Sequence, residues 1–116
     1  MAKYASMIVE GDSMEPTYSA GDWLMGRWAK YKLTGFNRIK VGDVVVIERD
    51  EQPGIFYVKR ISETRTSGGH MPTIYLLSDN EAGTDSRTWG WVPITSVRAK
   101  ILFTMKRASR MKRARG

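Results

Sequence analysis

The sequence predicts a small all-β domain, a compact barrel or sandwich. Three observations indicate this: short apolar segments of strand type, turn signals at short and regular spacing between them, and no segment with a convincing helical period. The chain has 116 residues, 41% of them hydrophobic and 27% charged, which is typical of a globular protein. That length is sufficient for one domain with its own core.

Six strands are predicted in order along the chain, over residues 7–11, 22–28, 41–50, 54–62, 73–79 and 97–103. The third contains an uninterrupted Val/Ile run bounded by turn residues, which indicates a buried strand. The last alternates Val97, Ala99, Ile101 and Phe103 with Arg98, Lys100 and Leu102, which indicates a half-buried strand. The polar segment 63–72 is expected to be an exposed hairpin loop, and the basic segment 29–40 a mobile loop.

Several classes of protein are excluded by what the sequence lacks. There is no cysteine, so disulfides, cysteine zinc sites and thiol nucleophiles are excluded. No apolar stretch reaches the roughly 20 residues of a membrane span, and the run before Glu10 is too short for a signal-peptide core. The one histidine, His70, lies in a polar loop without partner residues, so we assign it no role. We therefore expect no metal or other cofactor, and a protein that is cytoplasmic or peripheral at a membrane.

The net charge of +7 is concentrated at the C-terminus. Residues 106–116, KRASRMKRARG, hold six basic residues and no acidic one, which leaves 13 basic and 12 acidic residues in the rest of the chain. We expect residues 1–105 to form the folded domain and residues 106–116 a disordered basic tail. Such a tail can contact anionic lipid weakly, and we expect neither a specific nucleic-acid partner nor an oligomer.

Ser13 lies in the heptapeptide GDSMEPT at residues 11–17. A serine hydroxyl needs a neighbouring base to act as a nucleophile, and a tight turn supplies backbone N–H groups for an oxyanion. Gly11 permits the backbone torsions of such a turn, and Pro16 stiffens the segment that follows. The alternative is an ordinary turn in which Asp12 and Ser13 hydrogen bond to their own backbone.

Lys59 lies in the strand segment GIFYVKRIS. In an extended chain its side chain shares a face with Ile55, Tyr57 and Ile61, so the amine emerges from an apolar surface. Burial lowers the pKa of a lysine, which allows it to act as a general base. A Ser–Lys hydrolase needs these two groups together. The alternative is a lysine that extends to the edge of the sheet.

Asp85 and Arg87 are two residues apart and would share a face in an extended chain. An ion pair between them would brace a loop beside an active site. The alternative is a surface pair that contributes little to stability.

The order of the segments resembles the type I signal peptidase family. GDSMEPT is similar to the serine-bearing box of that family, and VKRI at 58–61 to its lysine-bearing box. The other similar segments are GDW at 21–23, VGDVVVI at 41–47, SDNEAGTDSRTWGWVP at 78–93 and the VRAKI that follows. The matches follow one order from about residue 8 to residue 101, a span that takes in most of the chain, and this ordered set is more specific than any single box.

The resemblance implies a coiled β-barrel and a serine endopeptidase without a cofactor, in which Ser13 is the nucleophile and Lys59 the general base. It implies an extended protein or peptide substrate that carries a signal peptide or N-terminal prosegment. The implied oxyanion turn is Gly11, Asp12, Ser13 and Met14; the substrate strands contain Ile8, Val9, Glu10, Tyr57 and Val58; and the lysine-orienting and bracing residues are Thr84, Asp85, Ser86 and Arg87.

Three departures from the family pattern affect these roles. Gly11 stands where some members carry a serine, and the spacer between Asn80 and the DSR tripeptide is one residue shorter than usual. The serine that commonly orients the lysine is therefore absent, and Thr84 is its expected replacement. The stretch from Lys59 to Asp79 is also too short for the extra domain of many bacterial members. A small form of this kind resembles the maturation proteases associated with nickel-type superoxide dismutase.

Three alternatives remain open from the sequence. One is a self-cleaving regulator of the LexA type, although only twelve residues precede Ser13. Another is a non-catalytic β-barrel that contacts nucleic acid through its basic tail, with Trp23, Trp28, Trp89 and Trp91 as stacking groups. The third is a catalytically inactive member of the peptidase fold.

Overall fold

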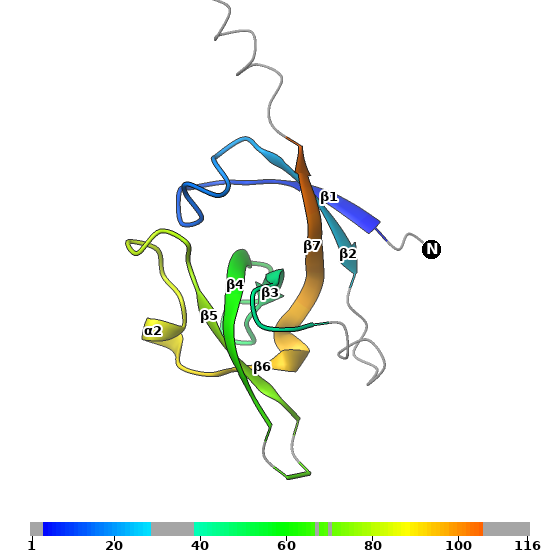
Figure 1. Cartoon of the computed structure of the whole chain (residues 1–116), viewed down its shortest axis with the longest axis vertical. Coiled ribbons are helices and arrows are strands. Elements are labelled where there is room, and N and C mark those ends of the chain that lie inside the picture. Colours follow the sequence, from blue (N-terminus) through cyan, green and yellow to red (C-terminus); the bar gives the residue numbers. More distant parts are fainter. Residues whose placement is uncertain (1–3, 29–38, 67, 70, 106–116) are drawn as a thin grey trace, which may run out of the picture.

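The described part of the chain forms one antiparallel sheet that curls on itself (Figure 1). The computed structural model describes residues 4–28, 39–66, 68–69 and 71–105. Within these ranges seven strands are hydrogen bonded in the order β1-β2-β7-β3-β4-β5-β6. Their bounds are β1 Tyr4–Ile8, β2 Trp23–Trp28, β3 Val44–Glu48, β4 Phe56–Arg65, β5 Thr73–Leu77, β6 Val92–Pro93 and β7 Val97–Met105. The prediction of an all-β, coiled barrel-like fold is confirmed.

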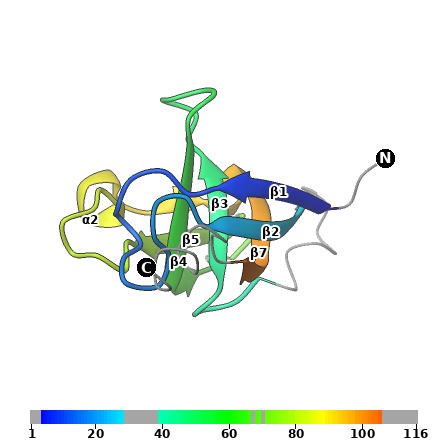
Figure 2. The same ribbon diagram turned by 90° about the horizontal axis from the view of Figure 1, so that it is seen from above.

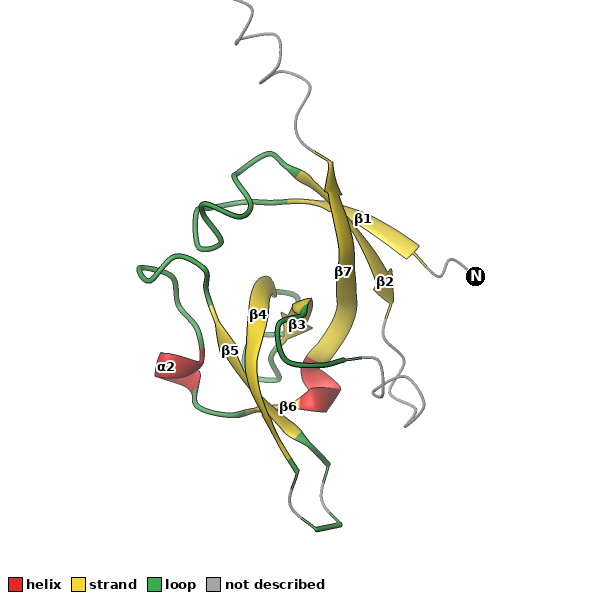
Figure 3. Cartoon of the chain, in the orientation of Figure 1, coloured by secondary structure: helices red, strands yellow, loops and turns green. Residues whose placement is uncertain are grey.

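Helical structure in the described residues is confined to two short segments (Figure 3). These are the four-residue helix α2, Ser86–Trp89, and a single 3-10 turn, Ile94–Ser96. No helix among the described residues is long and apolar enough to cross a membrane.

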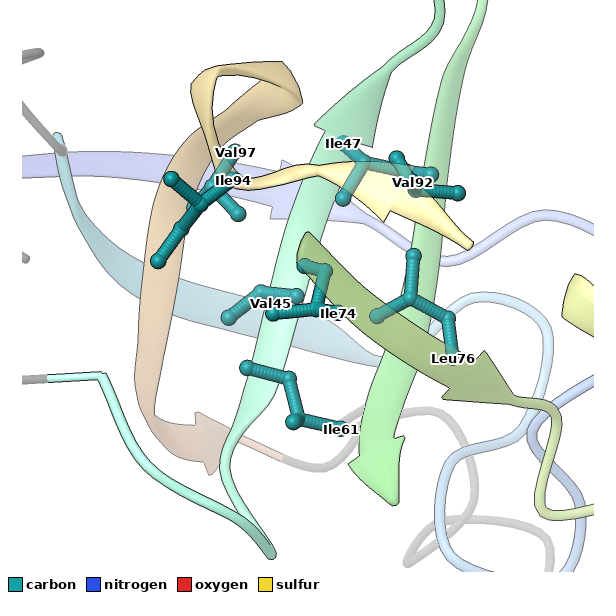
Figure 4. Packing of buried hydrophobic residues seen from close by; sticks show 8 residues of the cluster. All are labelled: Val45, Ile47, Ile61, Ile74, Leu76, Val92, Ile94 and Val97. Atoms are coloured by element: carbon teal, nitrogen blue, oxygen red, sulfur yellow. The ribbon is translucent and has the colours of Figure 1, made fainter. Parts of the chain in front are cut away.

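Strand β3 lies between the two apolar clusters of the core. Val45 and Ile47 point into one cluster, while Val44 and Val46 point into the other. The first cluster, drawn in Figure 4, consists of Val45, Ile47, Ile61, Ile74, Leu76, Val92, Ile94 and Val97. The second consists of Val9, Met14, Tyr18, Leu24, Val44, Val46, Ala99 and Ile101. Because β3 is buried on both faces, its sequence is continuously apolar rather than alternating.

The six predicted strands are confirmed, with bounds that differ by a few residues. Strand β4 continues to Arg65, so part of the predicted hairpin loop at 63–72 is strand. The short elements β6, α2 and the 3-10 turn were not predicted, because segments of two to four residues are too short to show a period. The predicted loop at 29–40 falls mostly outside the described residues, as does the basic tail.

The predicted inward position of Phe103 is wrong. Val97, Ala99 and Ile101 are buried as expected, but 52% of Phe103 is exposed. The pairing of β2 with β7 shifts between Met25 and Gly26, where Met25 lies opposite Phe103 and Gly26 opposite Ile101. This bulge adds one residue to β7 and reverses the alternation beyond Ile101.

Two loops that are far apart in the sequence lie side by side. Residues 9–22, between β1 and β2, approach residues 78–85, between β5 and α2, in both views of the fold (Figures 1 and 2). The backbone N–H of Asn80 donates to the carbonyl oxygen of Ser13 at 2.9 Å. The curl of the sheet therefore brings the serine-bearing turn to the end of β5.

Candidate active site

The serine-bearing turn contains a buried methionine and a glycine in a left-handed conformation. Gly11 has φ +75°, a left-handed conformation that favours glycine, as predicted for this turn. The side chain of Met14 is buried, 2% exposed, whereas Ser13 next to it is partly exposed. The backbone N–H of Glu15 donates to the Asp12 carbonyl at 3.1 Å, which closes the turn around Ser13.

The loop at 78–83 is hydrogen bonded to three consecutive residues of this turn, Asp12, Ser13 and Met14. Asn80 binds it twice, with the backbone bond to Ser13 and with Nδ2 donating to the Asp12 carbonyl at 3.0 Å. The backbone N–H of Asp79 donates to Sδ of Met14 at 3.4 Å. The position of Ser13 therefore depends on the loop that follows β5.

Lys59 lies on the buried face of β4, as the alternation predicted. It pairs with Val45 of β3 and is 1% exposed. Its Nζ lies 5.6 Å from the ring centre of Tyr57 and 6.0 Å from that of Trp89. Burial lowers the pKa of the amine, and this effect is opposed by the negative charge of Asp85 and reinforced by the positive charge of Arg87.

The hydrogen-bond partner of the amine is Ser78, a residue that the sequence reasoning missed. Lys59 Nζ donates to Ser78 Oγ at 2.8 Å, and Ser78 is only 8% exposed. Thr84, the expected partner, is exposed and contributes its backbone carbonyl, which accepts a bond from Ser78 Oγ at 3.4 Å. A signal for Ser78 was present, because it continues the inward face of β5 after Ile74 and Leu76. A buried hydroxyl at that position requires a partner.

The Asp85 carboxylate holds the backbone of Ser78. Its side chain is 1% exposed and caps α2 by accepting from the backbone N–H of Arg87 at 3.0 Å. It also accepts from the backbone N–H of Ser78 at 2.7 Å and from Arg87 Nε and Nη2 at 2.9 and 3.0 Å. The predicted Asp85–Arg87 pair is thus present in the structure. Burial by itself would raise the pKa of Asp85, but these hydrogen bonds outweigh it and lower the pKa to about 2.

The contacts of Gly83 show how near Ser13 lies to Ser78. A Cβ atom built on Gly83 would lie 2.8 Å from Cβ of Ser13 and 2.7 Å from Cβ of Ser78. The two serine Cβ atoms are therefore no farther apart than the sum of these distances, about 5.5 Å. No hydrogen bond joins Ser13 directly to Lys59. Ser78 lies near Ser13 and is hydrogen bonded to Lys59, so it links the two residues.

The serine turn keeps unused donors. In the described ranges, no residue accepts a hydrogen bond from the Ser13 hydroxyl or from the backbone N–H groups of Ser13 and Met14. Backbone N–H groups of this kind can stabilise an oxyanion, provided that a substrate oxygen reaches them.

The outer side of the loop carries a second ion pair. Arg60 donates to both carboxylate oxygens of Asp79, at 2.9 and 2.8 Å, and this bond lowers the pKa of Asp79. An open cleft of about 380 Å³ lies beside the pair. It is lined by Arg60, Ser62, Leu77, Ser78, Asp79, Glu81 and Arg87.

No three His, Asp or Glu side chains in the described residues come together as metal ligands.

Comparison with known protein families gives a match over the part of the chain that contains Ser13 and Lys59. The family described as signal peptidase, peptidase S26, matches residues 1–63, more than half of the chain. The chain belongs to this family. The matched region of this S26 chain ends before Ser78 and Asp85, so the family match does not include these two residues. No curated protein matches the chain.

The predicted substrate strands of this S26 chain each have an edge without a strand neighbour among the described residues. Strand β1 pairs only with β2, and the backbone of Val9 continues that pairing by donating to Asp22 at 2.9 Å. Strand β4 pairs with β5 only from Arg60 onward, so Tyr57 and Val58 pair with β3 alone. Ile8 and Glu10 are exposed, whereas Val9 is buried. One free edge thus leads toward Ser13 and the other ends at Lys59.

Proposed function

We propose that this S26 chain is a serine endopeptidase in which Ser13 is the nucleophile and Lys59 the general base. The observation that carries the proposal is the buried Lys59 amine, which is hydrogen bonded at 2.8 Å to a residue packed beside Ser13. Burial favours the neutral amine, the form that can accept a proton. Arg60, the next residue, could not take this role because a guanidinium stays protonated.

The proposed reaction begins when the Ser13 hydroxyl gives its proton to Lys59 Nζ and its oxygen bonds to the substrate carbonyl carbon. The backbone N–H groups at Ser13 and Met14 are the available donors for the oxyanion. The intermediate then collapses as the C–N bond breaks, and the Lys59 ammonium protonates the leaving amine. A water molecule, which gives its proton to Lys59, hydrolyses the acyl-enzyme ester and returns the Ser13 hydroxyl.

We propose that the substrate is an extended protein segment, a signal peptide or an N-terminal prosegment. The free edges of β1 and β4 support this, because an extended peptide can add to an exposed sheet edge through backbone hydrogen bonds. The segments that would contact it contain Ile8, Val9 and Glu10 on one side and Tyr57 and Val58 on the other.

The test uses a set of peptides that span prosegment junctions, with cleavage followed by mass spectrometry. We expect Ser13→Ala and Lys59→Met each to reduce kcat at least about 10³-fold, because residues of one catalytic unit fail together. Arg65→Met is the matched control, since Arg65 lies exposed farther along β4. Cleavage that survives in either site variant at wild-type rate contradicts the proposal.

A further inference from the structure

We infer that Ser78 is the residue that positions the Lys59 amine toward Ser13, and that it can do so because residue 83 has no side chain. The inference rests on the proposed function, and it concerns how the base is held rather than which residue is the base. Ser78 would thus take the place of the lysine-orienting serine that the family pattern has in the spacer and this chain lacks.

The direction of the hydrogen bonds supports this role. The Ser78 hydroxyl has one proton, which it gives to the Thr84 carbonyl at 3.4 Å, so an oxygen lone pair faces Lys59 Nζ at 2.8 Å. A neutral amine that donates one N–H to Ser78 has its own lone pair directed elsewhere. That lone pair is the acceptor that a nucleophile needs.

Ser78 is itself held where β5 ends. Its backbone N–H donates to Asp85 Oδ2 at 2.7 Å, and two residues earlier the backbone N–H of Leu76 donates to Ser86 Oγ at 2.9 Å. Both acceptors are buried, each 1% exposed. The start of α2 therefore holds the backbone of Ser78 at the end of β5, and the Thr84 side chain, which is exposed, takes no part in this.

Gly83 is required by the closeness of the two serines. A Cβ there would approach Ser13 and Ser78 to 2.8 and 2.7 Å, closer than Cβ atoms come in proteins, and would lie nearer still to Ser78 Oγ. The backbone of Gly83 is not left-handed, so its torsions do not demand glycine. What the position demands is space, because any side chain would push the loop away from Ser13, Ser78 or both.

The experiment compares Ser78→Ala with Thr84→Val in the full chain. We expect Ser78→Ala to reduce kcat about 100-fold with little change in KM, as misplacement of a reacting group does. We expect Thr84→Val, which removes only an exposed hydroxyl, to reduce kcat less than about twofold. An equal loss in both variants, or a Ser78→Ala enzyme with wild-type kcat, overturns the inference.

A second measurement does not depend on activity. In Ser13→Ala protein with ¹³C-labelled lysine, the Cε signal of Lys59 is titrated with and without Ser78→Ala. We expect the added substitution to lower the pKa of Lys59, since the ammonium loses its acceptor. An unchanged midpoint overturns the inference whether or not the enzyme cleaves peptides, whereas cleavage by Ser13→Ala protein would refute only the proposed function.

A third comparison tests the glycine. We expect Gly83→Ala to reduce kcat at least about tenfold. Gly68→Ala is the matched control, because a Cβ at Gly68 would meet nothing within 4 Å and its backbone is not left-handed. Thermal unfolding of each variant separates misplacement from unfolding: a Gly83→Ala protein that folds and keeps wild-type kcat contradicts the role of this position.

Discussion

Asp85→Asn replaces the carboxylate that holds both Ser78 and Arg87, with almost no change in size. The folded-state pKa of about 2 lies below the ordinary value of 3.8. At about 1.4 kcal/mol per pKa unit, ionised Asp85 contributes about 2 to 3 kcal/mol to the free energy of unfolding above pH 4. Each oxygen of Asp85 accepts two hydrogen bonds, so an amide NH₂ would face donors in either orientation. We therefore expect a loss of about 3 kcal/mol at pH 7, a fall in Tm of roughly 10 °C.

Urea unfolding followed by tryptophan fluorescence measures this loss. Because the folded-state pKa is depressed, the contribution of Asp85 is present above pH 4 and is lost as the pH falls through 2. The wild-type and Asp85→Asn stabilities should therefore converge between pH 4 and pH 2. Asp50→Asn is the control at an exposed site, with an expected change within about 0.5 kcal/mol. A difference for Asp85→Asn of the same small size at pH 7, or one that persists at pH 2, would refute the reasoning.

Two further predictions follow from the buried amine and from the tail. Lys59→Met should raise the free energy of unfolding by roughly 1 kcal/mol at pH 6, because the lowered pKa of Lys59 marks a penalty for burying its charge. The gain should shrink as the pH rises toward 10.5, where the unfolded state also loses the proton; a loss of stability at pH 6 in urea unfolding would count against it. Removal of residues 106–116 should weaken co-sedimentation with phosphatidylserine vesicles at least about tenfold in low salt. The exposed row of Ile8, Trp23 and Met105 lies where the tail begins, and binding that survives truncation would assign the contact to that row instead.

The strands were predictable because burial leaves a local record in the sequence. The continuous Val/Ile run of β3 reflects two buried faces, and the alternation of β4 placed Lys59 correctly on the apolar one. Phe103 was predicted wrongly because a bulge depends on how β2 pairs with β7, which no local pattern records.

The candidate site was predictable only residue by residue. The GDSMEPT turn, Lys59 and the Asp85–Arg87 pair were found from local chemistry and family resemblance, and the structure adds how they are related. Ser78 was not predicted because the comparison of spacer lengths pointed to Thr84, whereas the two-residue period of β5 places Ser78 with Ile74 and Leu76 on the buried face.

One loop connects the parts of the site, and an ion pair lies at each of its ends. Arg60 binds Asp79 where the loop leaves β5, and Arg87 binds Asp85 where it enters α2. Between them, Asn80 holds the backbone of Ser13 and Ser78 holds the amine of Lys59. This loop is one residue shorter than the family pattern and is fixed at both ends, so it can shift little. Together with the absence of a side chain at Gly83, this keeps Ser13 and Ser78 close together. Stability at Asp85 and geometry at Ser13 should therefore change together when this loop is altered.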